Sequence, residues 1–134
     1  MKYWLVKSEP DVYSYNTLET KGKGVWDGVR NYQARNNLRE MKVGDLLLFY
    51  HSNIGKEVVG IAKVTKESFP DPTTDNANWL AIEVAPVQKL KKAVTLENIK
   101  KDPLLQNMPL VKNSRLSVMP VSKLDFERIV ELGS

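Results

Sequence analysis

Short apolar runs separated by polar segments predict a chain that is rich in β-structure. Residues 46–50 (Leu-Leu-Leu-Phe-Tyr) and 58–64 (Val-Val-Gly-Ile-Ala-Lys-Val) are continuous runs of strand length, as in strands buried on both faces. Gly60 inside the second run predicts a bulge or a close approach by another backbone. Residues 3–7, 25–28 and 116–121 predict further short extended segments.

One more strand is predicted from alternation rather than from a continuous run. After Trp79, the side chains of Leu80, Ile82 and Val84 fall on one face, and those of Ala81, Glu83 and Ala85 on the other. The preceding residues 69–78 are rich in Pro, Asp, Thr and Asn, so we expect them to form an exposed loop.

Three helices are predicted from capping residues. Asn31 caps a helix that ends near Gly44 and carries apolar residues at helical spacing, namely Ala34, Leu38 and Met41. Thr95 caps a short helix that ends before Pro103. Ser122 opens a last helix with a capping box, and its core-facing residues are Phe126, Ile129 and Val130. Five or six strands and three helices in mixed order predict an α+β fold, a curled sheet or small barrel flanked by helices.

Length and composition limit the kind of protein and its chemistry. The 134 residues fit one domain, residues 1–134, with one hydrophobic core. The chain has no cysteine and one histidine, His51, which exclude disulfides, thiolate chemistry and a zinc cluster. We therefore expect no metal and no cofactor. The apolar segment at the start of the chain ends at Lys7 and is too short for a signal peptide, and no apolar run approaches the length of a membrane span. We therefore expect a soluble protein that is not exported.

The densest polar cluster, residues 26–39, surrounds the start of the Asn31 helix. It contains three arginines, three asparagines and one glutamine, and no acid occurs between Asp27 and Glu40. Helices usually carry acids in the first turn, where free backbone N–H groups favour negative charge. Cations there favour an anion site, in which Arg30 meets a phosphate and Arg35 and Arg39 extend the positive face. The alternative is a solvated basic face. The net charge of +4 agrees with a polyanionic partner but does not require one.

Trp26 stands directly before this charged cluster. One interpretation is that the indole packs in the core, as most buried tryptophans do. The other is that its face stacks on an unpaired or flipped-out base, while Asp27 and Asn31 form hydrogen bonds with the edge of that base.

Three further polar groups are candidates for a functional role. Lys7, Ser8 and Glu9 are the nearest approach to a catalytic group, but adjacent strand residues point to opposite faces unless the chain bends at Ser8. His51 follows a buried strand and is expected either to form a hydrogen bond as a neutral imidazole, to a backbone carbonyl or a phosphate, or to face solvent. Arg115 has the hydroxyl groups of Ser114 and Ser117 near it in sequence, and it is a candidate for a phosphate contact or for the pocket wall.

These segments, in this order, resemble the EVE domain family of the PUA-like superfamily. The resemblance extends over nearly the whole chain and rests on residues 3–10, 26–36, 43–45, 50–53, 59–62 and 114–118. Eukaryotic members include the thymocyte nuclear proteins, and the YTH readers of methyladenosine are more distant relatives with a similar order, here Lys7-Ser8, Trp26 and Gly60-Ile61-Ala62. The resemblance implies an α+β fold with a twisted mixed sheet or pseudo-barrel of about five or six strands and a pocket.

The resemblance also implies recognition of DNA or RNA that carries a modified base, with methylated or hydroxymethylated cytosine as proposed ligands. YTH pockets enclose a methyl group with several aromatic rings. Tyr50 or Phe69 are candidates for a second ring here, whereas Trp79 is expected to pack. Nuclear relatives carry a basic N-terminal tail that this sequence lacks, which favours a bacterial cytoplasmic protein. We expect a monomer.

Base recognition is assigned to Trp26 and its neighbours, and phosphate binding to the basic side chains around them. The predicted base-binding residues are Ser8, Trp26, Asp27, Gly28, Val29, Asn31, Tyr50, His51 and Ser117, and the predicted phosphate-binding residues are Lys7, Arg30, Arg35 and Arg115. Two alternatives remain: a small hydrolase or amidase that acts on a modified nucleobase through Lys7, Ser8 or Glu9, and a protein-interaction module.

Overall fold

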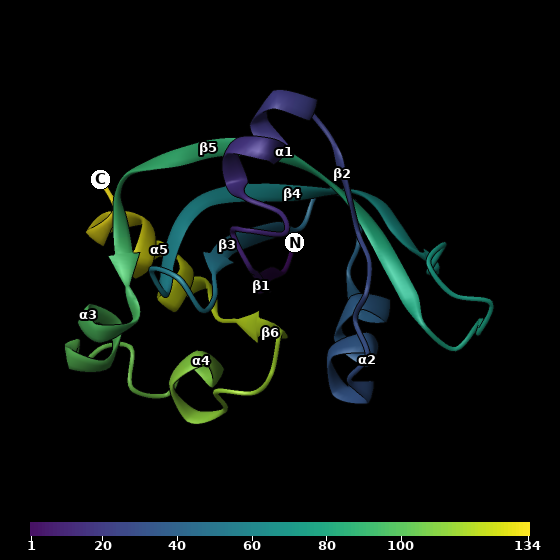
Figure 1. The fold of residues 1–134 in the computed structure, drawn as a ribbon. Helices are drawn as coiled ribbons and strands as arrows, with labels where there is room; N and C mark the ends of the chain where they lie inside the picture. The colour runs from purple at the N-terminus through teal and green to yellow at the C-terminus, as the bar shows by residue number, and fades with distance from the viewer.

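A six-stranded mixed sheet organises the protein, and the computed structural model describes all residues from 1 to 134. The strands lie in the order β2-β5-β4-β3-β1-β6, in which β1 and β3 are parallel and every other pair is antiparallel. Their bounds are β1 Tyr3–Ser8, β2 Gly24–Trp26, β3 Leu46–His51, β4 Glu57–Pro70, β5 Leu80–Thr95 and β6 Val118–Val121. The sheet is twisted, and because β2 and β6 remain as its edges it does not close into a barrel (Figure 1). The predicted α+β class with a twisted mixed sheet is confirmed.

The centre of the core is β3, which lies between β1 and β4. Its residues Leu47, Leu48 and Phe49 have no exposed surface, as the continuous apolar run predicted. Leu5 of β1 pairs with Leu48 and is equally buried. Burial on both faces explains why this run carries no polar alternation.

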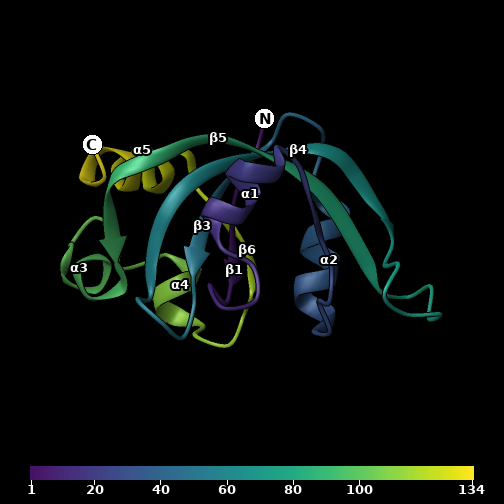
Figure 2. The ribbon, with the colours of Figure 1, turned by 45° about the horizontal axis from the view of Figure 1, so that its top comes forward.

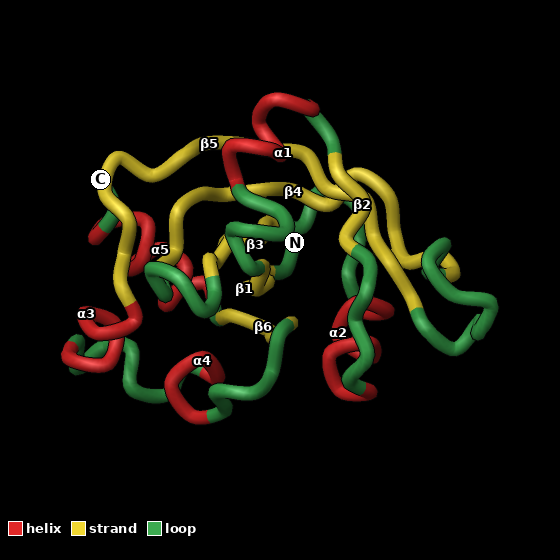
Figure 3. The backbone as a smooth tube through the Cα atoms, in the orientation of Figure 1, coloured by secondary structure: helices red, strands yellow, loops and turns green.

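The two longest strands, β4 and β5, form a bent hairpin that arches over the molecule and projects beyond its main body (Figure 3). The exposed loop predicted for residues 69–78 begins later than expected, because Phe69 and Pro70 still pair with Ala81 and Leu80. Asp71, within that predicted loop, is buried. The alternation predicted for β5 is also only partial, since both Ala81 and Ile82 are fully buried.

All three predicted helices are present, and two others were missed. The predicted ones are α2 (Tyr32–Glu40), α3 (Leu96–Lys101) and α5 (Lys123–Leu132), and the side chains of Asn31, Thr95 and Ser122 cap them. The α2 helix ends at Glu40, earlier than the predicted stop at Gly44. The α2 helix packs against β4, β5 and β6 and lies beside the hairpin. The helices α3, α4 and α5 lie at the other end of the sheet (Figure 2). None of the five helices has the length and apolarity that a membrane crossing requires.

The missed helices are α1 (Tyr15–Lys21) and α4 (Pro109–Lys112). The Ser14 hydroxyl accepts a hydrogen bond from the Thr17 N–H, and Gly22 ends α1 in the left-handed conformation with φ 78°. Only Tyr15 and Leu18 of α1 are buried, so the helix has too few apolar positions to show a periodic pattern. It packs on β5.

Tyr15 explains the glycine at position 60. The strand pairing shifts register on both sides of Gly60, so the predicted bulge is confirmed, but the close neighbour is a side chain rather than a backbone. A Cβ atom on Gly60 would lie 2.5 Å from carbon atoms of the Tyr15 ring. That ring is 1% exposed, and its hydroxyl donates a hydrogen bond of 2.7 Å to the carbonyl oxygen of Ile61.

We therefore expect Gly60→Ala to lower the free energy of unfolding by about 1–2 kcal/mol, as overpacked cores do. The ring cannot yield easily, because it is held at its hydroxyl and enclosed on its faces. Urea denaturation measures the change. In a Tyr15→Leu background the same substitution should cost much less, since the clash is removed. An equal cost in both backgrounds would contradict this explanation.

Candidate nucleic-acid interface

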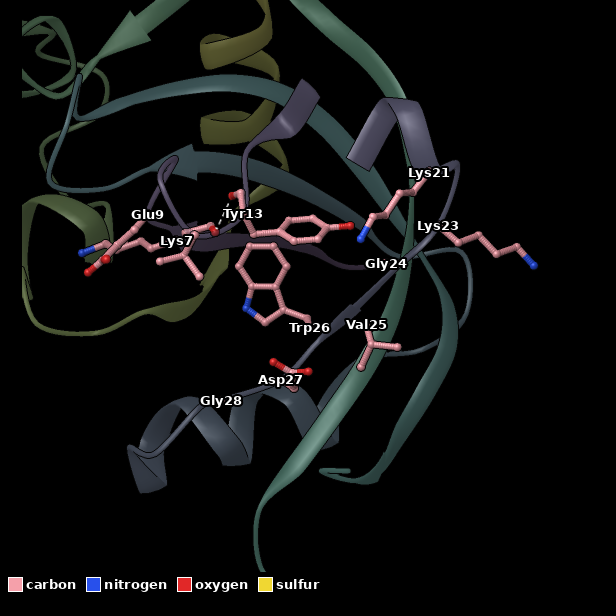
Figure 4. Close-up of a pocket in the computed structure, with 12 residues that line it drawn as sticks. Lys7, Glu9, Tyr13, Lys21, Lys23, Gly24, Val25, Trp26, Asp27 and Gly28 are labelled. Carbon is pink, nitrogen blue, oxygen red and sulfur yellow. Dashed lines mark hydrogen bonds between the residues drawn. The ribbon is translucent and has the colours of Figure 1, made fainter. Parts of the chain in front are cut away.

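A pocket of about 630 Å³ opens where β1 leaves the sheet, and its volume is in the range of small-ligand sites. Three segments enclose it: the end of β1 with the following loop, the end of α1, and β2 with the turn after it (Figure 4). The lining residues are Lys7, Ser8, Glu9, Val12, Tyr13, Lys21, Lys23, Gly24, Val25, Trp26, Asp27 and Gly28.

Trp26 lies both in the core and at this pocket. It pairs with Ile82 in the sheet, and its indole meets Phe49 edge to face, with centroids 5.2 Å apart and planes at 87°. Only 8% of Trp26 is exposed, so the two interpretations of this residue are not exclusive: most of the indole packs, and the remainder faces the cavity. Its stacking on a base stays a prediction.

Tyr13 is the second aromatic side chain of the pocket, in place of the predicted Tyr50 or Phe69. In the view of Figure 4 its phenol ring lies next to the Trp26 indole. The hydroxyl group is buried without a hydrogen-bond partner, and burial raises its pKa. It fits only because position 24 is glycine: a Cβ atom there would lie 2.3 Å from the hydroxyl oxygen. Tyr13 was missed because it belongs to an irregular loop without any pattern.

Lys7, Ser8 and Glu9 all line the pocket, because the strand ends at Ser8 and the chain bends there. Each of these three side chains already forms a hydrogen bond within the protein. The Lys7 ammonium donates to the carbonyl oxygen of Ser114 at 2.9 Å, the Ser8 hydroxyl donates to that of Tyr13 at 2.7 Å, and Glu9 accepts from the Asn53 amide at 2.7 Å. Burial lowers the pKa of Lys7.

The turn after Trp26 is held by a buried carboxylate that the sequence did not reveal. Asp71 accepts hydrogen bonds from the Gly28 N–H at 2.8 Å and from the Arg30 guanidinium at 2.9 Å, and it also binds Thr73. Arg30, predicted to bind phosphate, is thus paired within the protein, although its side chain is still 42% exposed. Burial, together with the charge of Asp71, raises the pKa of Asp27 on the pocket side of this turn.

The structure separates the predicted base-binding residues into two groups. Ser8, Trp26, Asp27 and Gly28 line the pocket, and the remaining ones do not, namely Val29, Asn31, Tyr50, His51 and Ser117. The Asn31 side-chain oxygen accepts from the Ala34 N–H at 2.9 Å and caps α2. The predicted hydrogen bond of His51 is formed with a backbone donor rather than with a carbonyl or a phosphate: Nε2 accepts from the Tyr15 N–H at 3.2 Å, and burial lowers the pKa of the ring.

The predicted phosphate-binding residues do not gather at the pocket. Only Lys7 lines the cavity; Arg115 is exposed on the loop before β6, and Arg35 lies on α2. Two lysines that were not predicted, Lys21 and Lys23, also line the pocket. No group of three or more histidine or acidic side chains is placed to hold a metal ion.

Comparison with known proteins identifies the family. The EVE domain model matches residues 2–132. Mouse thymocyte nuclear protein 1 is 35% identical over 164 residues, covering 97% of this chain and 73% of the relative. The zebrafish protein of the same name is also 35% identical, covering 96% of this chain and 71% of its own length.

Solved structures agree with this result. A protein from Agrobacterium tumefaciens superimposes with a TM-score of 0.98 at 42% identity, covering 100% of this chain and 94% of the other. Human thymocyte nuclear protein 1 in complex with 5-methylcytosine containing DNA gives a TM-score of 0.91 at 33% identity, covering 100% and 98%. An ASCH protein from Zymomonas mobilis, with a TM-score of 0.63 at 12% identity, shares the fold alone. This chain belongs to the EVE domain family.

Proposed function

We propose that this protein binds DNA and takes one modified base, a 5-methylcytosine or a related cytosine, into the pocket beside Trp26. The observation that carries the proposal is a cavity of about 630 Å³ lined by two aromatic rings, two carboxylates and three lysines. The crystal structure of human thymocyte nuclear protein 1 with 5-methylcytosine containing DNA supports the same ligand class for a chain of this family.

The chemistry of the lining residues suits an extruded base. Trp26 and Tyr13 provide aromatic surface for stacking, which contributes about 1–3 kcal/mol per base. The carboxylate of Asp27 is an acceptor for the exocyclic amine of cytosine. Lys21 and Lys23, which also line the pocket, supply the positive charge for the phosphates that flank such a base.

Trp26→Leu tests the proposal, because leucine keeps an apolar side chain but removes the flat ring. We expect the affinity for a methylated oligonucleotide to fall about tenfold or more, as the loss of base stacking predicts, and the preference over an unmethylated one to fall with it, because the base is no longer held in the pocket. Fluorescence anisotropy on matched oligonucleotides measures both affinities, and circular dichroism checks the fold.

The matched control is Trp4→Leu, the same substitution at a buried indole outside the pocket. Trp4 donates its ring N–H to Asp45 at 3.0 Å, so this variant should lose stability and keep its preference for the methylated oligonucleotide. An unchanged preference in folded Trp26→Leu would refute the role of the pocket.

A base-modifying hydrolase is the second candidate, because Lys7, Ser8 and Glu9 line one pocket and burial lowers the pKa of Lys7. The hydrogen bonds of Lys7 and Ser8 to backbone carbonyls favour a structural role for both side chains over nucleophilic attack. Turnover of an acetylated cytidine that disappears in Lys7→Ala would support the hydrolase instead.

A further inference from the structure

A cluster of aromatic and cationic side chains lies outside the pocket, where α2 meets the β4–β5 hairpin. The rings of Tyr32 and Trp79 are stacked, with centroids 5.0 Å apart and planes at 26°. Arg35 lies 5.0 Å from the centre of the Tyr32 ring, and Arg30 lies 5.6 Å from that of Trp79. We call these four residues the Tyr32 stack.

The Tyr32 stack is rigid but open to solvent. Tyr32 is 64% exposed, although large aromatic side chains usually bury most of their surface. Arg35 is held by hydrogen bonds to the Asn78 carbonyl oxygen at 3.2 Å and to the Asn36 side chain at 3.0 and 3.2 Å. An exposed ring that is fixed in place has little conformational entropy to lose when a flat partner binds.

Charge at the exposed end of the Tyr32 stack favours an anionic partner. No carboxylate forms an ion pair with Arg35. Three of its N–H groups are used in the bonds to Asn36 and Asn78, which leaves two of the five guanidinium donors. The phosphates of a nucleic acid present the oxygen atoms that such a donor pair matches.

The Tyr32 stack and the pocket belong to one connected unit. Gly28 lines the pocket and Tyr32 begins α2 only four positions later. Asp71 joins the two sites, because it accepts hydrogen bonds from the Gly28 N–H and from Arg30 of the stack. In Figures 1 and 2, β2, α2 and the hairpin lie side by side. Four residues span at most about 14 Å of chain, so a strand that places one base in the pocket has Tyr32 within reach.

We propose that the Tyr32 stack is a second contact for nucleic acid, which binds an unpaired base next to the one held in the pocket. This inference rests on the proposed function. The base stacks on the exposed end formed by Tyr32 and Arg35, and Arg35 also pairs with a neighbouring phosphate. Both aromatic rings and guanidinium planes stack on bases without regard to their identity. The Tyr32 stack thus contributes affinity, whereas the pocket contributes the preference for a modified base.

Tyr32→Ala tests this division of roles. The probe is a DNA oligonucleotide that carries 5-methylcytosine and, in an unpaired position beside it, the fluorescent base 2-aminopurine. Binding of the wild type should quench the probe, since stacking quenches 2-aminopurine. In Tyr32→Ala we expect the quenching to disappear and the affinity to fall about tenfold for methylated and unmethylated oligonucleotides alike. The ratio of the two affinities should stay unchanged, and Tyr32→Phe should behave as the wild type.

A pair of charge variants on one helix controls for the loss of positive charge. Arg35→Gln and Arg39→Gln each remove one cation from α2. We expect only Arg35→Gln to reduce the quenching.

Equal quenching and affinity in Tyr32→Ala and the wild type would overturn the inference and leave the pocket proposal standing. A loss of affinity in Tyr32→Ala with an intact preference in Trp26→Leu would support the Tyr32 stack and overturn the pocket. No binding of any oligonucleotide by the wild type would overturn both.

Discussion

Replacing Phe49 by alanine should lower the free energy of unfolding by about 3–5 kcal/mol, the range for deleting a fully buried aromatic ring. Phe49 has no exposed surface and stands at the centre of an aromatic cluster. Its ring meets those of Tyr15, Trp26 and His51 edge to face, with centroids 5.3, 5.2 and 5.7 Å apart. Because a domain of this size has only about 5–15 kcal/mol of stability, the variant loses a large share of it.

A milder substitution at Phe49 separates the effect on binding from the loss of stability. Phe49→Leu keeps most of the volume but removes the edge-to-face contact that orients the Trp26 indole. This variant should remain folded and show a weaker preference for the methylated oligonucleotide. Leu105→Ala, a fully buried site between α3 and α4, is the control: it should lower stability at least as much as Phe49→Leu does and leave the preference unchanged. Guanidinium denaturation and fluorescence anisotropy measure the two quantities. If both variants change the preference equally, Phe49 has no specific role at the pocket.

The sequence predicted those helices and strands that are determined by residues close to one another along the chain. Asn31, Thr95 and Ser122 each satisfy backbone N–H groups within three residues, so their helices were visible in the sequence. The β3 strand was visible because burial on both faces demands a continuous apolar run. The α1 helix was not, because only Tyr15 and Leu18 are buried and the rest of its stability comes from packing on β5.

The candidate site shows the same division between local and distant causes. Trp26, Asp27 and Gly28 were predicted together because they are adjacent in sequence, and all three line the pocket. The sequence predicts a phosphate-binding role for Arg30, since no acid occurs between Asp27 and Glu40. Its partner Asp71 lies 41 positions further along the chain and is brought to it by the pairing of β4 with β5. A pattern of neighbouring residues carries no information about such a contact.

Asp71→Asn should lower the free energy of unfolding by about 2–3 kcal/mol at neutral pH. The carboxylate accepts four hydrogen bonds, two from Thr73 and one each from Gly28 and Arg30, and an asparagine offers one oxygen in place of two. The expected cost stays below the roughly 3–5 kcal/mol for a fully buried ion pair, because 42% of the Arg30 side chain is exposed.

The pH dependence of this difference follows from the pKa of Asp71. Burial alone would raise that pKa, but the hydrogen bonds from Thr73, Arg30 and Gly28 outweigh burial and hold it well below the ordinary value of 3.8. A carboxyl group whose pKa is lower in the folded state stabilises the protein above its unfolded pKa and loses this contribution as the pH falls. The difference in the free energy of unfolding between the wild type and Asp71→Asn should therefore have its full size at pH 7 and become smaller below about pH 4.

Asp75→Asn is the matched control for Asp71→Asn, since Asp75 lies in the same loop, is exposed and has no hydrogen bond to its side chain. It should change stability by less than about 0.5 kcal/mol at either pH. Because Asp71 holds both Gly28 at the pocket and Arg30 in the Tyr32 stack, its loss should weaken the binding of methylated and unmethylated DNA together. Urea denaturation at pH 7 and pH 3, with anisotropy at pH 7, tests both parts. A stability difference that is the same at the two pH values would show that the ionised carboxylate is not the source of the stabilisation.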